Sequence, residues 1–344
     1  MKSPIKLLLA VLAVVVASVS GCAIDHSGQD SSKPTIRIAY QSFPSGDLIV
    51  KNKHWLEDAL PNYNIKWTKF DSGADVNTAF IARQIDFGAI GSAPVARGLS
   101  APLDIPYQVA FVLDVAGDNE ALVARNGTGI NSVAELRGKR VATAFASTAH
   151  YSLLAALAQA DVPAKDVNII DLQPQASLAA WDRGDVDAVY TWLPTLDKLR
   201  ATGKTLIASK QLATAGKPTL DLGVVATSFA AAHPDVVDTW RKIEARALTT
   251  IKNDPNSAAS AIAAEMGITD ADAKNQLSQG TYLTTADLTT PTWLGVDGKP
   301  GNLAVNLASA AQFLADQQQI PSAPALDVLQ KAIYTKGLPG VFSQ

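Results

Sequence analysis

Three short segments pair a hydroxyl side chain with the predicted start of a helix. They are Asp71-Ser72-Gly73, Gly91-Ser92-Ala93 and Ala146-Ser147-Thr148, and each follows a predicted strand. A helix N-terminus offers unpaired N–H donors and a partial positive charge, so it can bind an anion without a buried countercharge. For any one segment alone, a serine that caps its own helix is the better interpretation. The same pattern recurs in both of the two lobes that the sequence predicts (35–124 with 226–344, and 125–225). This recurrence favours a shared anion site made of Ser72, Gly91, Ser92, Ser147 and Thr148.

Aromatic and imidazole side chains lie close to these segments in the sequence. His150 follows Thr148 by two residues, so its ring can donate to the same anion from the first helical turn. The alternative is a histidine that is satisfied under a loop. Tyr40 and Trp192 end predicted strands and can present ring faces to a cation, or they can pack in the core or between lobes.

Two carboxylates are candidates for binding a cationic group of the same ligand. Glu120 starts the predicted outgoing connection between lobes, and Asp221 enters the predicted return connection. A carboxylate buried there is costly without a partner. A ligand ammonium is one such partner, and Arg125 or Lys139 is the alternative.

The elements that must position these residues follow a repeated pattern. Short alternating or apolar segments predict strands, and helical periodicity follows most of them. The predicted strands are 35–40, 64–70, 85–90, 139–145, 167–172 and 186–191, and the predicted helices include 74–84, 148–160 and 176–183. Strand, glycine turn and helix in this order predict α/β sheets with mainly parallel strands. Ligands bind outside the carboxyl ends of such strands, where the candidate residues lie.

Two further apolar strands, 121–124 and 222–226, lie on either side of the middle block. We interpret them as hinge crossings between two lobes. Lobe one then comprises 35–124 and 226–344, and lobe two comprises 125–225. Two α/β lobes joined by two crossings form a clamshell that closes about a hinge.

Composition excludes several classes of protein. The 344 residues are 47% hydrophobic and carry a net charge of −3, which favours neither nucleic-acid binding nor disorder. Cys22 is the single cysteine, so the sequence has no disulfide and no Cys/His metal pattern. We expect a monomer without metal or cofactor.

The N-terminus predicts export. Lys2 and Lys6 precede an apolar run over 7–19, which is typical of a secretory signal peptide spanning 1–21. Val19-Ser20-Gly21-Cys22 resembles the bacterial lipobox, which implies a lipidated Cys22 and anchoring at the outer face of the cytoplasmic membrane. Residues 22–34 are then the lipidated cysteine and a polar, flexible tether. The alternative is an ordinary signal peptide with a chance cysteine.

Several motifs together resemble the taurine-binding proteins of ABC importers. They occur in order between Ile36 and Leu283: Lys69-Phe70-Asp71-Ser72-Gly73, Ile90-Gly91-Ser92-Ala93-Pro94, Asn119-Glu120-Ala121-Leu122, Phe145-Ala146-Ser147-Thr148-Ala149-His150-Tyr151-Ser152, Asp171-Leu172-Gln173-Pro174, Ala179-Ala180-Trp181, Tyr190-Thr191-Trp192-Leu193-Pro194 and Pro218-Thr219-Leu220-Asp221. The resemblance implies a two-lobed periplasmic-binding-protein fold of type II, sulfonate capture in the cleft, and delivery to a permease with its ATPase. The segment 42–62 does not align with the family pattern.

A sulfonate suits the predicted site because it presents three acceptor oxygens and no donor. Taurine adds an ammonium group, which Asp221 and Glu120 can receive together with Trp192. An aliphatic sulfonate without an amine is one alternative, and Asp221 should then turn from the cleft or pair with a lysine or arginine. Glycine betaine or choline is another, which needs an aromatic cage from Tyr40, Tyr151 and Trp192.

An enzyme is the remaining alternative. Ser147, His150 and Asp221 include the residue types of a hydrolase triad. The sequence has no GxSxG elbow, P-loop, dinucleotide fingerprint or HExxH motif. We therefore expect a binding protein with no catalytic residues.

Overall fold

The structure is a computed structural model that describes residues 32–338 and 340–342. The predicted signal peptide, Cys22 and most of the predicted tether lie outside these residues. Residues 33–344 form one compact unit.

The first of two five-stranded sheets combines four strands from the N-terminal part of the described chain with one strand that follows the second sheet in sequence. Its order is β2-β1-β3-β10-β4, with β1 parallel to β2 and β3, and β10 antiparallel to β3 and β4. The strands are β1 (Thr35–Gln41), β2 (Asn64–Phe70), β3 (Phe87–Gly91), β4 (Tyr107–Val115) and β10 (Leu220–Ala226). β3 is buried along its whole length, which explains its uninterrupted apolar sequence.

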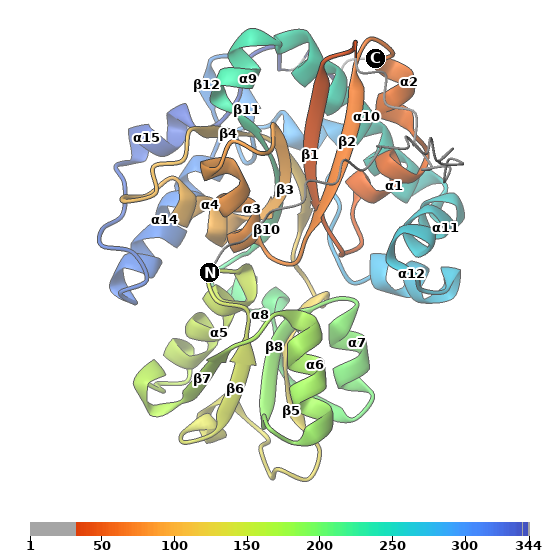
Figure 1. Cartoon of the computed structure of the whole chain (residues 1–344). Helices are drawn as coiled ribbons and strands as arrows, with labels where there is room; N and C mark the ends of the chain where they lie inside the picture. The colour runs from red at the N-terminus through yellow and green to blue at the C-terminus, as the bar shows by residue number, and fades with distance from the viewer. Residues whose placement is uncertain (1–31, 339, 343–344) are drawn as a thin grey trace, which may run out of the picture. The chain divides into compact units, whose positions relative to one another are not determined.

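The second sheet has the same arrangement of parallel and antiparallel neighbours. Its order is β7-β6-β8-β5-β9, with β6 parallel to β7 and β8, and β5 antiparallel to β8 and β9. The strands are β5 (Glu120–Arg125), β6 (Arg140–Thr143), β7 (Asn168–Asp171), β8 (Ala188–Trp192) and β9 (Gly203–Ala208). The predicted α/β architecture of two lobes is therefore confirmed, with a mixed sheet in each lobe (Figure 1).

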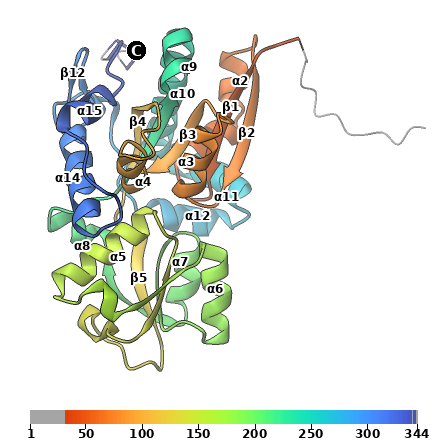
Figure 2. The same ribbon diagram turned by 60° about the vertical axis from the view of Figure 1, so that its left-hand side comes forward.

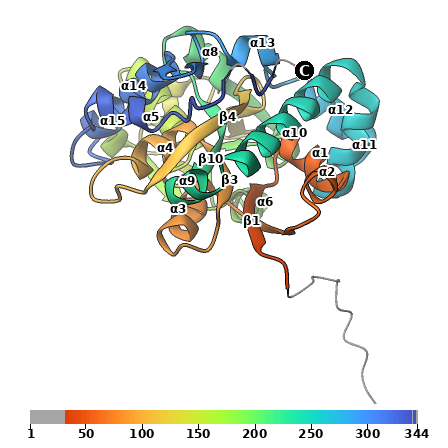
Figure 3. The same ribbon diagram turned by 90° about the horizontal axis from the view of Figure 1, so that it is seen from above.

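Helices cover both sheets. Those of the second lobe are α5 (Thr148–Gln159), α6 (Pro174–Arg183), α7 (Thr195–Arg200) and α8 (Ser209–Thr214). Those of the first are α1 (Gly46–Asn52), α2 (Trp55–Ala59), α3 (Gly73–Ile81), α4 (Ser92–Gly98), α9 (Thr227–Ala232), α10 (Pro234–Asn253), α11 (Pro255–Met266), α12 (Asp270–Leu277), α13 (Thr285–Leu288), α14 (Leu303–Asp316) and α15 (Leu326–Lys331). Figures 1, 2 and 3 show α14 and α15 on one side of the first lobe, opposite α11 and α12. Two 3-10 turns, Val133–Leu136 and Ala164–Asp166, and the short strands β11 (Gly295–Val296) and β12 (Lys299–Pro300) complete the elements.

The predicted crossing points are displaced by one strand. β5 pairs on both edges with strands of the second sheet, and β10 pairs on both edges with strands of the first. The outward crossing therefore lies between Val115 and Glu120, rather than near Arg125. The return lies between Thr214 and Leu220, rather than near Ala226. Both strands were predicted as hinge crossings because apolar character alone does not reveal which sheet a strand joins.

The segment 42–62 forms α1 and α2 on the first lobe. None of the helices in the described part of the chain combines the length and the hydropathy that a bilayer span requires.

Candidate ligand-binding cleft

A pocket lies between the two lobes, where the ends of β1, β3 and β8 meet the starts of α3 and α5. It holds about 470 Å³ of space, part of which is open to solvent. It brings together six of the ten predicted ligand residues: Gly91, Glu120, Ser147, Thr148, Trp192 and Asp221. Ser72, Ser92, His150 and Tyr40 do not line it. Phe43 and Pro44 from the unaligned segment do.

Hydrogen bonds join the two lobes. Gln173 Nε2 from the second lobe donates to Ser72 Oγ of the first over 3.2 Å. Arg200 Nη1 donates to Gln279 Oε1 over 2.7 Å, and Gln276 Nε2 donates to Asp197 Oδ2 over 3.1 Å. The two lobes are therefore in contact in this structure, and the cleft lies between them.

The hydroxyl groups of the three predicted serines form hydrogen bonds with other atoms of the protein. Ser147 Oγ accepts from the backbone N–H of His150 at 3.1 Å and donates to the Ala144 carbonyl, so it caps α5 while lining the pocket. Ser92 Oγ accepts from the backbone N–H of Leu220 at 3.1 Å. Ser72 Oγ donates to Asp75 Oδ2 over 2.8 Å. At two of the three helix starts, the adjacent glycines Gly73 and Gly91 face the pocket instead of the serines.

His150 lies outside this pocket. Its Nδ1 accepts from the Ala146 backbone N–H at 3.3 Å, and its ring stacks on Phe145 with centroids 4.6 Å apart. It lines a separate small cavity with Arg97 and Gln319. Burial lowers the pKa of His150 to about 4, so the ring is neutral at pH 7. The structure thus matches the alternative interpretation of a histidine packed beneath a loop.

The two predicted aromatic residues differ in position. Trp192 ends β8 and lines the pocket. The Tyr40 ring packs edge-on against Trp67, with centroids 6.3 Å apart, and Lys51 Nζ lies 5.2 Å from its centre. Tyr40 therefore belongs to the packing of the first lobe.

Glu120 is held by a cluster of four hydroxyl groups. Its Oε1 accepts from Ser152 at 3.0 Å, Ser209 at 2.6 Å and Thr219 at 3.1 Å, and its Oε2 accepts from Thr148 at 2.5 Å. Burial raises the pKa of Glu120, and these hydrogen bonds oppose that shift. Glu120 thus fixes the start of β5 to α5, α8 and the return crossing. Ser152, Ser209 and Thr219 were not predicted, because only the fold brings them together.

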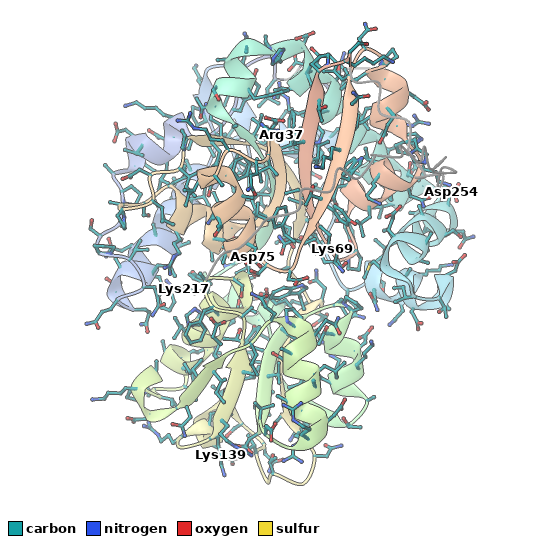
Figure 4. The ribbon with its side chains drawn as sticks, viewed as in Figure 1. Arg37, Lys69, Asp75, Lys139, Lys217 and Asp254 are labelled. Carbon is teal, nitrogen blue, oxygen red and sulfur yellow. The ribbon has the colours of Figure 1, made fainter. Side chains whose placement is uncertain are left out.

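Asp221 presents a carboxyl group to the pocket without a cationic partner. It is partly exposed, and it lines the pocket. No lysine or arginine among the described residues forms an ion pair with Asp221 or Glu120. Arg125 instead donates to the Val186 carbonyl, and Lys139 lies at the far end of the second lobe, whereas Lys69 and Asp75 lie near the junction (Figure 4).

Asp114 and Tyr282 are two further residues that sequence reasoning missed. Asp114 is fully buried on β4, opposite Asp221 on β10, and accepts a hydrogen bond from Asn119 Nδ2 at 3.2 Å. Tyr282 Oη donates to the Pro44 carbonyl over 2.8 Å. Burial, followed by the charges of Asp114 and Asp221, raises the pKa of Tyr282. The described residues contain no group of three or more His, Cys, Asp or Glu side chains placed to hold a metal.

Comparison with known proteins identifies the family of this chain. Residues 69–258 match the family model described as NMT1/THI5 like. The chain is 36% identical over 268 residues to the taurine-binding periplasmic protein of Escherichia coli, covering 75% of this chain and 79% of that protein. It is 33% identical over 258 residues to a putative aliphatic sulfonates-binding protein of Bacillus subtilis, covering 73% and 76%.

A solved structure shows the same fold. The alkanesulfonate-binding protein SsuA from Xanthomonas axonopodis pv. citri, bound to MOPS, superposes with a TM-score of 0.72 at 21% identity. The match covers 88% of this chain and 99% of that one. The chain therefore belongs to the NMT1/THI5 like family, beside the taurine-binding type of periplasmic binding protein that its motifs resemble.

Proposed function

We propose that this chain is the exported substrate-binding protein of an ABC importer, and that it captures taurine in the cleft for delivery to a permease and its ATPase. The names of the two curated relatives support a sulfonate ligand, because one binds taurine and the other is assigned aliphatic sulfonates. The choice of taurine rests on the structure of the cleft.

The observation that carries this choice is the carboxyl group of Asp221. Asp221 lines the pocket, and no lysine or arginine among the described residues forms an ion pair with it. An aliphatic sulfonate without an amine offers this carboxyl no cationic group to bind. The ammonium group of taurine provides the missing charge, and Trp192 lies in the same pocket to face it.

The sulfonate end would bind at the helix starts. Gly73 is the first residue of α3, Ser147 caps α5 and Thr148 is its first residue, and all three residues line the pocket. The first N–H groups of a helix have no intrahelical acceptor, so they suit an anion with three acceptor oxygens. Planar carboxylates such as that of β-alanine would leave a donor unpaired, at a cost of about 1–3 kcal/mol.

The competing functions are less well supported. Of the cage proposed for betaine or choline, only Trp192 lines the pocket, since Tyr40 packs on Trp67 and Tyr151 packs on Phe313. A hydrolase triad needs a hydrogen bond from the serine hydroxyl to the histidine ring. Here Ser147 Oγ donates to the Ala144 carbonyl instead, and His150 Nδ1 accepts from the Ala146 N–H.

Isothermal titration of residues 33–344 with taurine, ethanesulfonate, β-alanine and glycine betaine tests the proposal. We expect taurine to bind at least about tenfold more tightly than ethanesulfonate, and Asp221→Asn to remove that difference. Equal affinity for ethanesulfonate would move the ligand to alkanesulfonates in general. Binding of glycine betaine alone would overturn the anion site.

Lipid anchoring of Cys22 belongs to the same proposal and rests on the lipobox-like sequence alone. Expression of the full chain and of Cys22→Ser in a bacterial host, followed by membrane fractionation, tests it. The full chain should partition with membranes, and the Cys22→Ser variant should not. Equal partitioning of both would overturn the anchor and leave the ligand assignment untouched.

A further inference from the structure

Two aspartates lie opposite each other on neighbouring strands, and one of them, Asp221, lines the pocket. Asp114 on β4 pairs in register with Asp221 on β10, at a point where the ladder is irregular. Each aspartate lies close enough to the other to affect its ionisation. Asp114 is fully buried, whereas Asp221 reaches the pocket.

A hydrogen bond between two carboxyl groups requires a proton, because ionised carboxylates only accept. Oδ1 of Asp114 is buried and has no conventional donor among the described residues. Oδ2 accepts from Asn119. A protonated Asp221 would supply the donor that Asp114 Oδ1 lacks, and without that proton two negative charges would lie side by side.

The surroundings favour retention of this proton. The titratable groups that act on the pair are Glu120 from β5, Asp47 from α1 and Tyr282 from the loop before α13. None of these is cationic. Burial, followed by the neighbouring carboxylates, raises the pKa of Asp221 well above its ordinary value.

We propose that Asp114 and Asp221 share one proton when the pocket is empty, and that the ammonium group of a ligand takes the place of that proton. This inference rests on the proposed function and adds Asp114, a positioning residue that acts through Asp221. Ligand binding then ionises both carboxyls, so the amine is recognised by a pair of charges rather than one. A sulfonate without an amine leaves the shared proton in place.

The sign of the pH dependence follows from this exchange. Since the complex holds fewer protons than the free protein, binding releases a proton to solvent and tightens as pH rises. The trend continues until the free pair has lost its proton or the ligand's own amine is neutral. Ethanesulfonate should show no such trend.

Titration calorimetry of residues 33–344 in phosphate and in Tris measures the released proton. The two buffers have different ionisation enthalpies, so the observed binding enthalpy differs between them in proportion to the number of protons released. We expect a release approaching about one proton with taurine and near zero with ethanesulfonate. Asp114→Asn should bring the taurine value close to zero and flatten the pH profile, since an amide cannot share a carboxyl proton. Asp118→Asn, an exposed carboxylate in the same crossing, should keep the wild-type release.

Each result decides the inference. Equal proton release with both ligands, or undiminished release in Asp114→Asn, would overturn the shared proton while leaving taurine capture intact. Absence of any taurine binding by the wild type would overturn the proposed function itself. Should Asp114→Asn not fold, the comparison of the two ligands on the wild type still decides the matter.

Discussion

Gly91 of β3 and Thr148 of α5 face each other across the cleft so closely that a Cβ atom on Gly91 would lie 2.5 Å from Thr148 Cγ2. Gly91 belongs to the first lobe and Thr148 to the second, and both line the pocket. The approach of the lobes seen here therefore requires glycine at position 91. Its φ is not in the left-handed region, so the requirement is one of space rather than of backbone conformation.

We predict that Gly91→Ala weakens ligand binding at least about tenfold, because the added methyl group holds the lobes apart by overpacking. Thr148→Ser removes Cγ2 but keeps the hydroxyl that donates to Glu120. The double variant should therefore recover most of the affinity. A double-mutant cycle by titration calorimetry measures this coupling, and additive losses would show that the contact does not limit closure.

The hydroxyl cluster around Glu120 makes a prediction about stability. Ser209 Oγ donates to Glu120 over 2.6 Å and lies 3.0 Å from Tyr190 Oη, fully buried. Ser209→Ala removes a hydrogen bond to a carboxylate and leaves the Tyr190 hydroxyl without this partner. We expect the free energy of unfolding to fall by about 1.5–3 kcal/mol in urea denaturation. Ser278→Ala, at an exposed helix end, is the control, and an equal effect there would contradict the argument.

Local sequence patterns predicted the elements around the cleft well. The predicted strand at 64–70 and the predicted helix at 148–160 match β2 and α5 to within one residue. These segments have strong periodicity and clear turn or capping residues at their ends, so neighbouring residues suffice to define them. The strands β4 and β9 were not predicted, and β5 and β10 were predicted but placed wrongly as crossings.

The parts of the site that sequence missed depend on long-range pairing. Asp114 follows an apolar run, and nothing near it in sequence shows that it opposes Asp221 on another strand. The four hydroxyls on Glu120 likewise come from three separate parts of the chain, namely α5, α8 and the return crossing. Such partners become visible only once strand order is known, whereas Asp221 and Trp192 could be placed because each adjoins a predicted strand end.

Burial of His150 leads to a prediction about how the stability of the protein depends on pH in the acid range. Burial lowers its folded-state pKa to about 4, below the ordinary value of 6.5. Between these values the unfolded chain binds more protons, so this residue's contribution to stability is present above pH 6.5 and is lost as pH falls toward 4. We expect His150→Gln to flatten the dependence of unfolding free energy on pH there, by up to about 2–3 kcal/mol. His54→Asn, at an exposed position, is the control variant.

Glu244 on α10 predicts the opposite trend. It is fully buried, and neither of its carboxylate oxygens has a hydrogen-bond partner among the described residues. Burial, followed by the nearby charge of Asp47, raises the pKa of Glu244 well above its ordinary value. The folded protein therefore holds a proton that the unfolded chain has released, and the free energy of unfolding declines as pH rises above the unfolded-state pKa.

The variant Glu244→Gln keeps the shape of the protonated side chain and removes this loss of stability at high pH. We expect it to raise the free energy of unfolding by about 1–3 kcal/mol at pH 8, with little change at pH 4.5. Urea denaturation at the two pH values measures the difference, with exposed Glu135→Gln as the control. A loss of stability at pH 8 would mean that the ionised carboxylate of Glu244 has a partner that its surroundings in the fold do not suggest.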